Sequence, residues 1–98
     1  MIVYGYAIAT MYTNDGTYMI QTRIPSAHGP MMSEDYRGAK VTNYTPDSEL
    51  PWYPSLLLPT TPTWGDVVVL TSTNESTTDF LVLGVTGGQY KSEPYLGR

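Results

Sequence analysis

Residues 2–25 read IVYGYAIATMYTNDGTYMIQTRIP, and this stretch decides the fold. From Ile2 to Tyr12, large side chains occupy every second position with smaller ones between them, which predicts a strand over residues 2–13. The NDG of residues 14–16 indicates a hairpin turn, because Asn and Asp tolerate left-handed backbone angles and Gly adopts them freely. Alternation resumes over residues 17–25, so we predict a second strand that Pro25 ends.

Three further strands are predicted downstream of this hairpin. They cover AKVTNYT at 39–45, DVVVLTS at 66–72 and DFLVLGVT at 79–86, where Gly87 and Gly88 end the last one. No long amphipathic helix is visible; the best candidate is a single turn at 48–50, capped by Asp47 or Ser48. Five strands without a helix predict an all-β fold, a small five-stranded OB-fold barrel with a long third connection. A sandwich is the alternative, but it usually needs about seven strands.

The length and composition narrow the class of protein. Ninety-eight residues fit one domain, which we divide into a barrel over 1–88 and a C-terminal arm over 89–98. There is no cysteine, hence no disulfide or thiolate metal site. We expect no signal peptide, because no N-terminal segment pairs positive charge with an apolar run, and no membrane span, because the longest apolar runs have four residues. Five basic residues, scattered among nine acidic ones, argue against binding to nucleic acid.

Low charge and abundant tyrosine favour an interaction module. Only 14% of residues are charged, where roughly 25% is usual, and nine tyrosines accompany one phenylalanine. Tyrosine suits interfaces, where its ring is buried and its hydroxyl finds a partner. We expect partner contacts first at these positions: Met31, Met32, Tyr36, Leu57, Tyr90 and Tyr95. For the two methionines, ordinary gap filling is an equally good reading.

The segment DSELPWYPSLLLP, residues 47–59, is too short for a membrane span and too rich in proline for a helix. It is either an apolar connection laid over the core or a surface for another chain. Pro51 favours an extended Leu50, so that Trp52 enters at a defined direction and covers one end of the barrel. Further along, glycine and aspartate at a strand entry and a glycine at a bulge complete the structural positions: Leu50, Pro51, Trp52, Gly65, Asp66 and Gly84.

Four pieces together resemble a known family. They are RIPSAHG at 23–29, DSELPWYPSLLLP at 47–59, WGDVVVL at 64–70 and DFLVLGVTGG at 79–88, so the resemblance covers about two-thirds of the chain. This order is similar to the OB-fold domain near the N-terminus of phage baseplate hub and central spike proteins and of type VI secretion spikes. The acidic-Leu-Pro-Trp element with a downstream Gly-Asp-Val is its most specific part.

The resemblance implies a structural role without turnover or cofactor. It places the chain in the virion, at a tail baseplate assembled in the host cytoplasm, as a homo-oligomer of usually three copies between the tail hub and the central spike. Larger family members continue into a lysozyme-like domain or a triangular β-helix. The sequence has no β-helix repeat, metal-ligand tip or hydrolase, so the piercing and wall-degrading activities do not carry over.

Two other classes of function were weighed on the residues. The candidate acid–base groups are carboxylates in predicted loops, at Glu34-Asp35 and Asp47…Glu49, and one histidine, His28. We therefore expect no catalytic, cofactor or metal site. A single-stranded nucleic-acid-binding OB-fold is the alternative that remains. Its stacking platform would be Tyr4, Tyr6, Tyr12 and Tyr18, which are otherwise core or interface residues.

Overall fold

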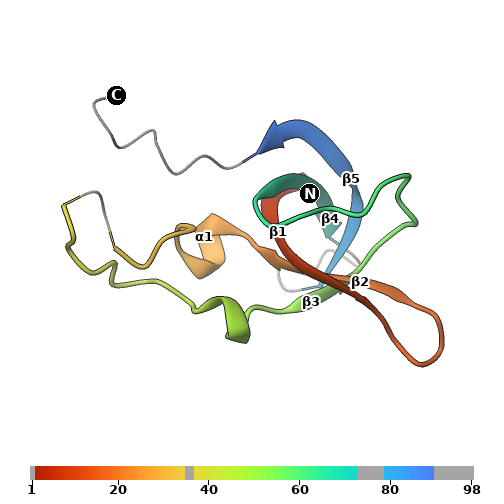
Figure 1. Ribbon diagram of the computed structural model, residues 1–98, viewed down its shortest axis with the longest axis horizontal. Helices are drawn as coiled ribbons and strands as arrows, with labels where there is room; N and C mark the ends of the chain where they lie inside the picture. The colour runs from red at the N-terminus through yellow and green to blue at the C-terminus, as the bar shows by residue number, and fades with distance from the viewer. Residues whose placement is uncertain (1, 35–36, 73–78, 90–98) are drawn as a thin grey trace.

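The computed structural model describes residues 2–34, 37–72 and 79–89, and it is mostly β (Figure 1). Five strands form one antiparallel sheet in the order β3-β2-β1-β4-β5. The strands are β1 (Ile2–Tyr12), β2 (Tyr18–Arg23), β3 (Trp52–Pro54), β4 (Asp66–Ser72) and β5 (Phe80–Gln89). The predicted all-β class with five strands is thus confirmed.

The β1–β2 hairpin forms where the sequence predicts it. Its register runs from Tyr12 opposite Tyr18 back to Tyr6 opposite Arg23, with a bulge between Ala7 and Ala9. At the turn, the carboxylate of Asp15 accepts hydrogen bonds from the hydroxyl of Thr13 and from both the backbone N–H and the hydroxyl of Thr17. These bonds to the charged form lower the pKa of Asp15.

The predicted third strand at 39–45 is wrong, because that segment lies in a loop and β3 is Trp52–Pro54. Within 39–45, Lys40 makes an isolated bridge with Glu34. The N–H of Thr45 donates to the carbonyl of His28 at 2.9 Å, so this donor has a hydrogen-bond partner without joining a sheet. Pro54 is tolerated in β3 because an edge strand needs fewer N–H donors.

The two edge strands of the sheet meet at one point. Ser55, just after β3, forms an isolated parallel bridge with Val82 of β5, and the N–H of Leu56 donates to the carbonyl of Val82 at 3.0 Å. Figure 1 shows the light-blue start of β5 lying beside β3. The sheet is therefore curved enough for its first and last strands to touch. β5 itself runs to Gln89, past the glycines predicted to end it.

The core lies on the concave side of this sheet. Tyr53 and Phe80 meet edge to face at 5.6 Å between ring centroids, and Val3 and Leu58 pack against the cluster. Its fully or nearly buried members are Ala7, Tyr18, Ile20, Ile24, Tyr53, Val68, Leu70, Phe80 and Val82.

On β1 the smaller set of side chains faces this core and the larger set faces away. Gly5 and Ala7 are buried, whereas Ile2 and Tyr4 are exposed. The reason is close packing: a Cβ on Gly5 would lie 2.9 Å from the carbonyl oxygen of Arg23. Large residues do not fit where β1 passes so near β2.

Two short helical segments connect the strands. α1 (Pro25–His28) follows β2, with proline in its first turn, and the 3-10 turn η1 (Asp47–Glu49) precedes β3. The single turn expected near 48–50 is present, but its N-terminal cap is Pro46 and no side chain caps it. Over the described part of the chain, no helix has the length and apolarity needed to cross a membrane.

Candidate interaction surface

The convex side of the β1-β4-β5 sheet is apolar, although it faces solvent. Strand pairing sets Tyr4 beside Val69, and Val69 in turn beside Gly84. Tyr4 is 62% exposed and Ile2 is 55% exposed. We call this surface the outer face; it comprises Ile2, Tyr4, Tyr6, Val67, Val69, Thr71 and Leu81. None of these is charged, whereas the solvated side of an antiparallel sheet is ordinarily polar.

A second feature is an uncharged groove, which lies where the chain after β3 separates from β5. Residues 56–60 and 83–86 line a groove of about 450 Å³ between them. Leu57 is 77% exposed at this site, and Leu56, Leu83 and Val85 are also exposed. No lining residue carries a charge. We call this site the β5 groove.

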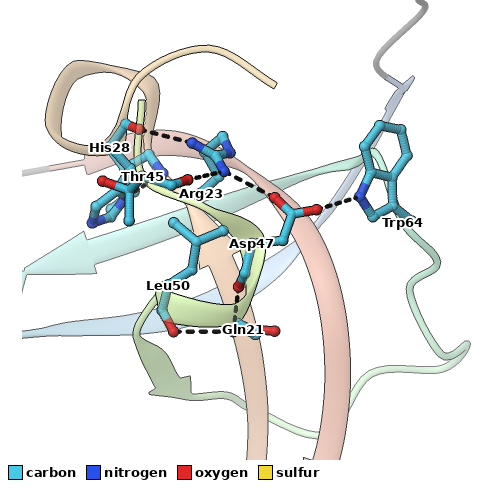
Figure 2. A network of polar contacts seen from close by, with 8 residues as sticks. Gln21, Arg23, His28, Thr45, Asp47, Leu50 and Trp64 are labelled. Carbon is cyan, nitrogen blue, oxygen red and sulfur yellow. Dashed lines mark hydrogen bonds and ion pairs between the residues drawn. The ribbon is translucent and has the colours of Figure 1, made fainter. Parts of the chain in front are cut away.

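A buried arginine organises the opposite end of the sheet (Figure 2). Arg23, at the end of β2, is fully buried and its guanidinium donates to the carbonyls of His28 and Thr45. It also pairs with the carboxylate of Asp47 at 2.9 Å and lies over the ring of Tyr44, 4.5 Å from its centroid. One N–H, at Nε, has no hydrogen-bond partner among the described residues.

Asp47 also accepts hydrogen bonds from two further side chains, those of Trp64 and Gln21. Its second carboxylate oxygen accepts from the indole N–H of Trp64 at 3.3 Å, and its backbone carbonyl accepts from the side-chain amide of Gln21 at 2.7 Å. The same amide of Gln21 donates to the carbonyl of Leu50 at 3.1 Å. Figure 2 shows these contacts joining β2, η1 and the loop before β4. The arrangement fixes loops to the sheet.

His28 is held in its neutral form at this cluster. Its Nδ1 accepts a hydrogen bond from the backbone N–H of Ile24 at 2.9 Å, which requires that nitrogen to be unprotonated. Burial, followed by the positive charge of Arg23, lowers the pKa of His28. Its neighbour Gly29 has φ +86 and would bring a Cβ within 2.4 Å of the carbonyl oxygen of Asn43, so the loop packs directly on this glycine.

The structural residues chosen from sequence lie in three places. Leu50 is buried and Pro51 accepts a hydrogen bond from the N–H of Thr22 at 3.2 Å, so both fasten the chain entering β3. Trp52 is only half-buried on this edge strand, and the next residue, Tyr53, enters the core instead. The cover of the barrel end by Trp52 stays a prediction.

The remaining structural residues lie on β4 and β5. Gly65 has φ +92 and donates to the carbonyl of Ala7 at 2.8 Å; Asp66 accepts from the N–H of Thr63 at 2.8 Å and so closes the turn into β4. Gly84 lies next to an irregularity in the β4–β5 register, and a Cβ there would meet nothing within 4 Å. Gly84 thus accompanies a bulge rather than a close backbone approach.

The expected partner contacts divide between surface and interior. Leu57 and Met32 are exposed, and Leu57 belongs to the β5 groove. Met31, in the loop after α1, is wrong as a surface contact because it is only 4% exposed. Tyr36, Tyr90 and Tyr95 lie outside the described residues. The outer face as a whole was not predicted, although two of its residues, Tyr4 and Tyr6, are named above as stacking, core or interface residues. The alternating large residues are visible in the sequence, but the side of the sheet that they occupy is not.

The tyrosines proposed for base stacking form two pairs in different places. Tyr18 is buried in the core and Tyr12 lies against it at 4.9 Å between ring centroids, whereas Tyr4 and Tyr6 are on the outer face. Arg23 is buried and already paired, which removes it from any phosphate-binding surface. Among the described residues, no group of three or more His, Asp or Glu side chains is arranged to hold a metal.

Comparison with known proteins returns no relative from which to draw a function: no protein-family model, curated protein or solved structure matches the chain.

Proposed function

We propose that the chain is an OB-fold interaction module that assembles as a homotrimer in a phage tail baseplate, between the tail hub and the central spike. Its role is mechanical and requires no cofactor. The resemblance described above is the basis for the particle and the partners. The geometry supports the more general part, a small β domain built to be covered by other chains.

The outer face is the observation that carries this proposal. A free domain would lose about 25 cal/mol for each Å² of apolar surface left in water, and contiguous exposed apolar surface is typical of interaction sites. Tyr4 and Ile2 are more than half exposed there. Because the outer face has no charged side chain, copies of the same chain can approach it without placing like charges together.

The strand arrangement supports an OB-type barrel as the scaffold. Long β1 pairs with β2 along one side and with β4 along the other, and the edges β3 and β5 meet at Ser55 and Val82. An OB-fold is a five-stranded, partly open barrel. Closure also reduces the free edges at which sheets aggregate, leaving specific surfaces for assembly.

Light scattering on the full-length chain tests the assembly. We expect a mass three times that of the monomer for the natural sequence and a monomer for Tyr4→Lys. Asn14→Lys is the matched control, because it adds the same charge at an exposed position of the hairpin turn and is expected to stay trimeric. A natural chain that remains a monomer, also in the presence of hub protein, would refute the proposal.

Isolation of assembled particles tests the location. An affinity-tagged chain is expected to co-purify with hub and spike proteins, identified by mass. Tight, salt-sensitive retention of single-stranded DNA in a mobility-shift assay would instead favour the nucleic-acid-binding alternative.

A further inference from the structure

The β5 groove opens between two segments that start out paired. After Ser55 bridges Val82, the N–H of Leu56 makes one more bond to β5, and then residues 56–60 diverge from residues 83–86. The bridge is parallel, so both segments run in the same direction as they separate. The groove therefore has the shape left when one strand withdraws from the side of another.

This groove offers both backbone and side-chain recognition. β5 pairs with β4 on one side, while beyond Val82 no described residue pairs with its other side. An unpaired strand edge next to apolar side-chain space is the surface to which an extended peptide adds as a further strand. A volume of about 450 Å³ lies in the range of ligand pockets, which run from about 300 to 1,000 Å³.

The chain itself contains a segment of matching chemistry. Residues 90–98, YKSEPYLGR, follow directly after β5 and lie outside the described residues. Pro94 favours an extended residue before it, and Tyr95 and Leu96 are adjacent apolar side chains. Nine residues span at most about 30 Å when extended, enough to reach an adjoining copy of a domain this small.

The direction of β5 favours a groove on another copy. Residues 83–86 come before Gln89, and β5 continues past them in the direction in which the groove opens. In Figure 1 the blue arrow of β5 points away from the green loop that follows β3. A segment that follows β5 would have to reverse direction to pair with residues 83–86 of its own chain, which favours the groove of a neighbouring copy.

We propose that residues 90–98 of each copy occupy the β5 groove of the next copy, with Tyr95 and Leu96 against its leucines. This inference rests on the proposed oligomer and adds to the outer face a second contact between neighbouring copies. The contact is heterologous, or head-to-tail, because the C-terminal segment of one copy binds a different surface, the β5 groove, of the next copy. A heterologous contact closes into a ring when each copy inserts its own segment into one neighbour and binds the segment of the other, as a cyclic trimer requires.

Cysteine pairing tests the contact directly, because the natural chain contains no cysteine. Full-length copies carrying Leu57→Cys are co-expressed with tagged copies carrying Leu96→Cys, and the assembly is oxidised. We expect a mixed disulfide-linked dimer, several times more abundant than with the control pair Asn14→Cys and Leu96→Cys. The same test with Leu83→Cys samples the other wall of the groove. If neither groove position links above the control, the proposal is wrong.

Placing both Leu57→Cys and Leu96→Cys in one chain distinguishes the copies. Disulfide-linked oligomers are expected, whereas a monomer with an internal disulfide would show that the segment fills its own groove and would overturn the proposal. In parallel, Leu57→Asp and Leu96→Asp should each weaken assembly roughly tenfold to a hundredfold, as for loss of one buried leucine contact, and their combination should add little. Met11→Asp, exposed on the β1–β2 hairpin, is the control.

The two proposals fail separately. If the natural chain is trimeric but the groove pairs do not link and the aspartate variants remain trimeric, the oligomer stands and this contact is excluded. If the natural chain is a monomer, both proposals are refuted.

Discussion

Adding one methyl group at Gly5 tests the packing of β1 on β2. A Cβ there would lie 2.8 Å from Thr22 Cγ2 and 2.9 Å from the carbonyl oxygen of Arg23, with Leu70 Cδ1 at 3.3 Å. The side-chain atoms can shift, but the carbonyl belongs to the backbone of β2. Arg23 is also tied by its own side chain to the loop before η1, which restricts its movement.

Two opposing effects set the change in the free energy of unfolding expected for Gly5→Ala. Overpacking a tight site costs about 1–3 kcal/mol, while replacing glycine by alanine stabilises by about 0.4–1 kcal/mol through the unfolded state. We expect Gly5→Ala to lower the free energy of unfolding by about 1–2 kcal/mol on balance. For a domain of this length, each kcal/mol corresponds to about 4–8 °C in Tm.

Gly87→Ala is the matched control, because a Cβ at Gly87 meets nothing within 4 Å, its φ is not positive and it does not line the β5 groove. Urea unfolding followed by tryptophan fluorescence, at one fixed protein concentration, compares both variants with the natural chain. Gly87→Ala should be as stable as the natural chain or slightly more so. If Gly5→Ala unfolds at the same urea concentration as Gly87→Ala, the close approach of β1 to β2 is wrong.

Three further predictions concern the loops. Arg23→Met should lower the free energy of unfolding by about 3–5 kcal/mol in urea titrations, because it leaves the His28 and Thr45 carbonyls and Asp47 without their partner; a loss below about 1 kcal/mol would contradict this clamp. Since the folded pKa of His28 is lowered, its contribution to stability is complete above the unfolded value of about 6.5 and is lost as pH falls through the folded pKa. The amide oxygen of His28→Asn can accept the hydrogen bond from the N–H of Ile24, but the amide does not titrate. This variant should therefore lose less stability than the natural chain as pH falls below about 6.5, and an unchanged slope of stability against pH would show that other groups cause the loss. Met31→Ala should cost about 2–5 kcal/mol in thermal unfolding and Met32→Ala less than about 0.5 kcal/mol, because only Met31 is buried; equal effects would refute the placement of this loop.

The hairpin and the two valine- and leucine-rich strands could be predicted because their signals are local. Alternation over residues 2–13 and the NDG turn need no knowledge of the rest of the chain. The third strand could not, because AKVTNYT has acceptable strand residues whose backbone groups are engaged by contacts from α1 and Arg23. Three residues around Tyr53 form β3 instead, although Pro51 precedes the strand and Pro54 is its last residue, because an edge strand tolerates proline.

Alternation also does not reveal which side of a strand faces the core. On β1 the bulky set would be the obvious core, yet Gly5 and Ala7 face inward, because β2 passes too close for larger side chains. In the same way Trp52 was the more conspicuous aromatic, but the pairing of Trp52 with Gln21 places Tyr53 opposite Ile20 and toward Phe80. The β5 groove joins segments over twenty residues apart, and only the fold brings them together.

The guanidinium of Arg23 fastens both ends of the long loop between α1 and η1. It holds the carbonyl of His28 at the start and the carbonyl of Thr45 and the carboxylate of Asp47 at the finish. Lengthening a loop whose ends are already pinned costs little, about 0.6 kcal/mol for each doubling. The middle of this loop is thus a natural place for insertions and for grafted peptides, since a new sequence around Gly38 would leave the sheet beneath it unchanged.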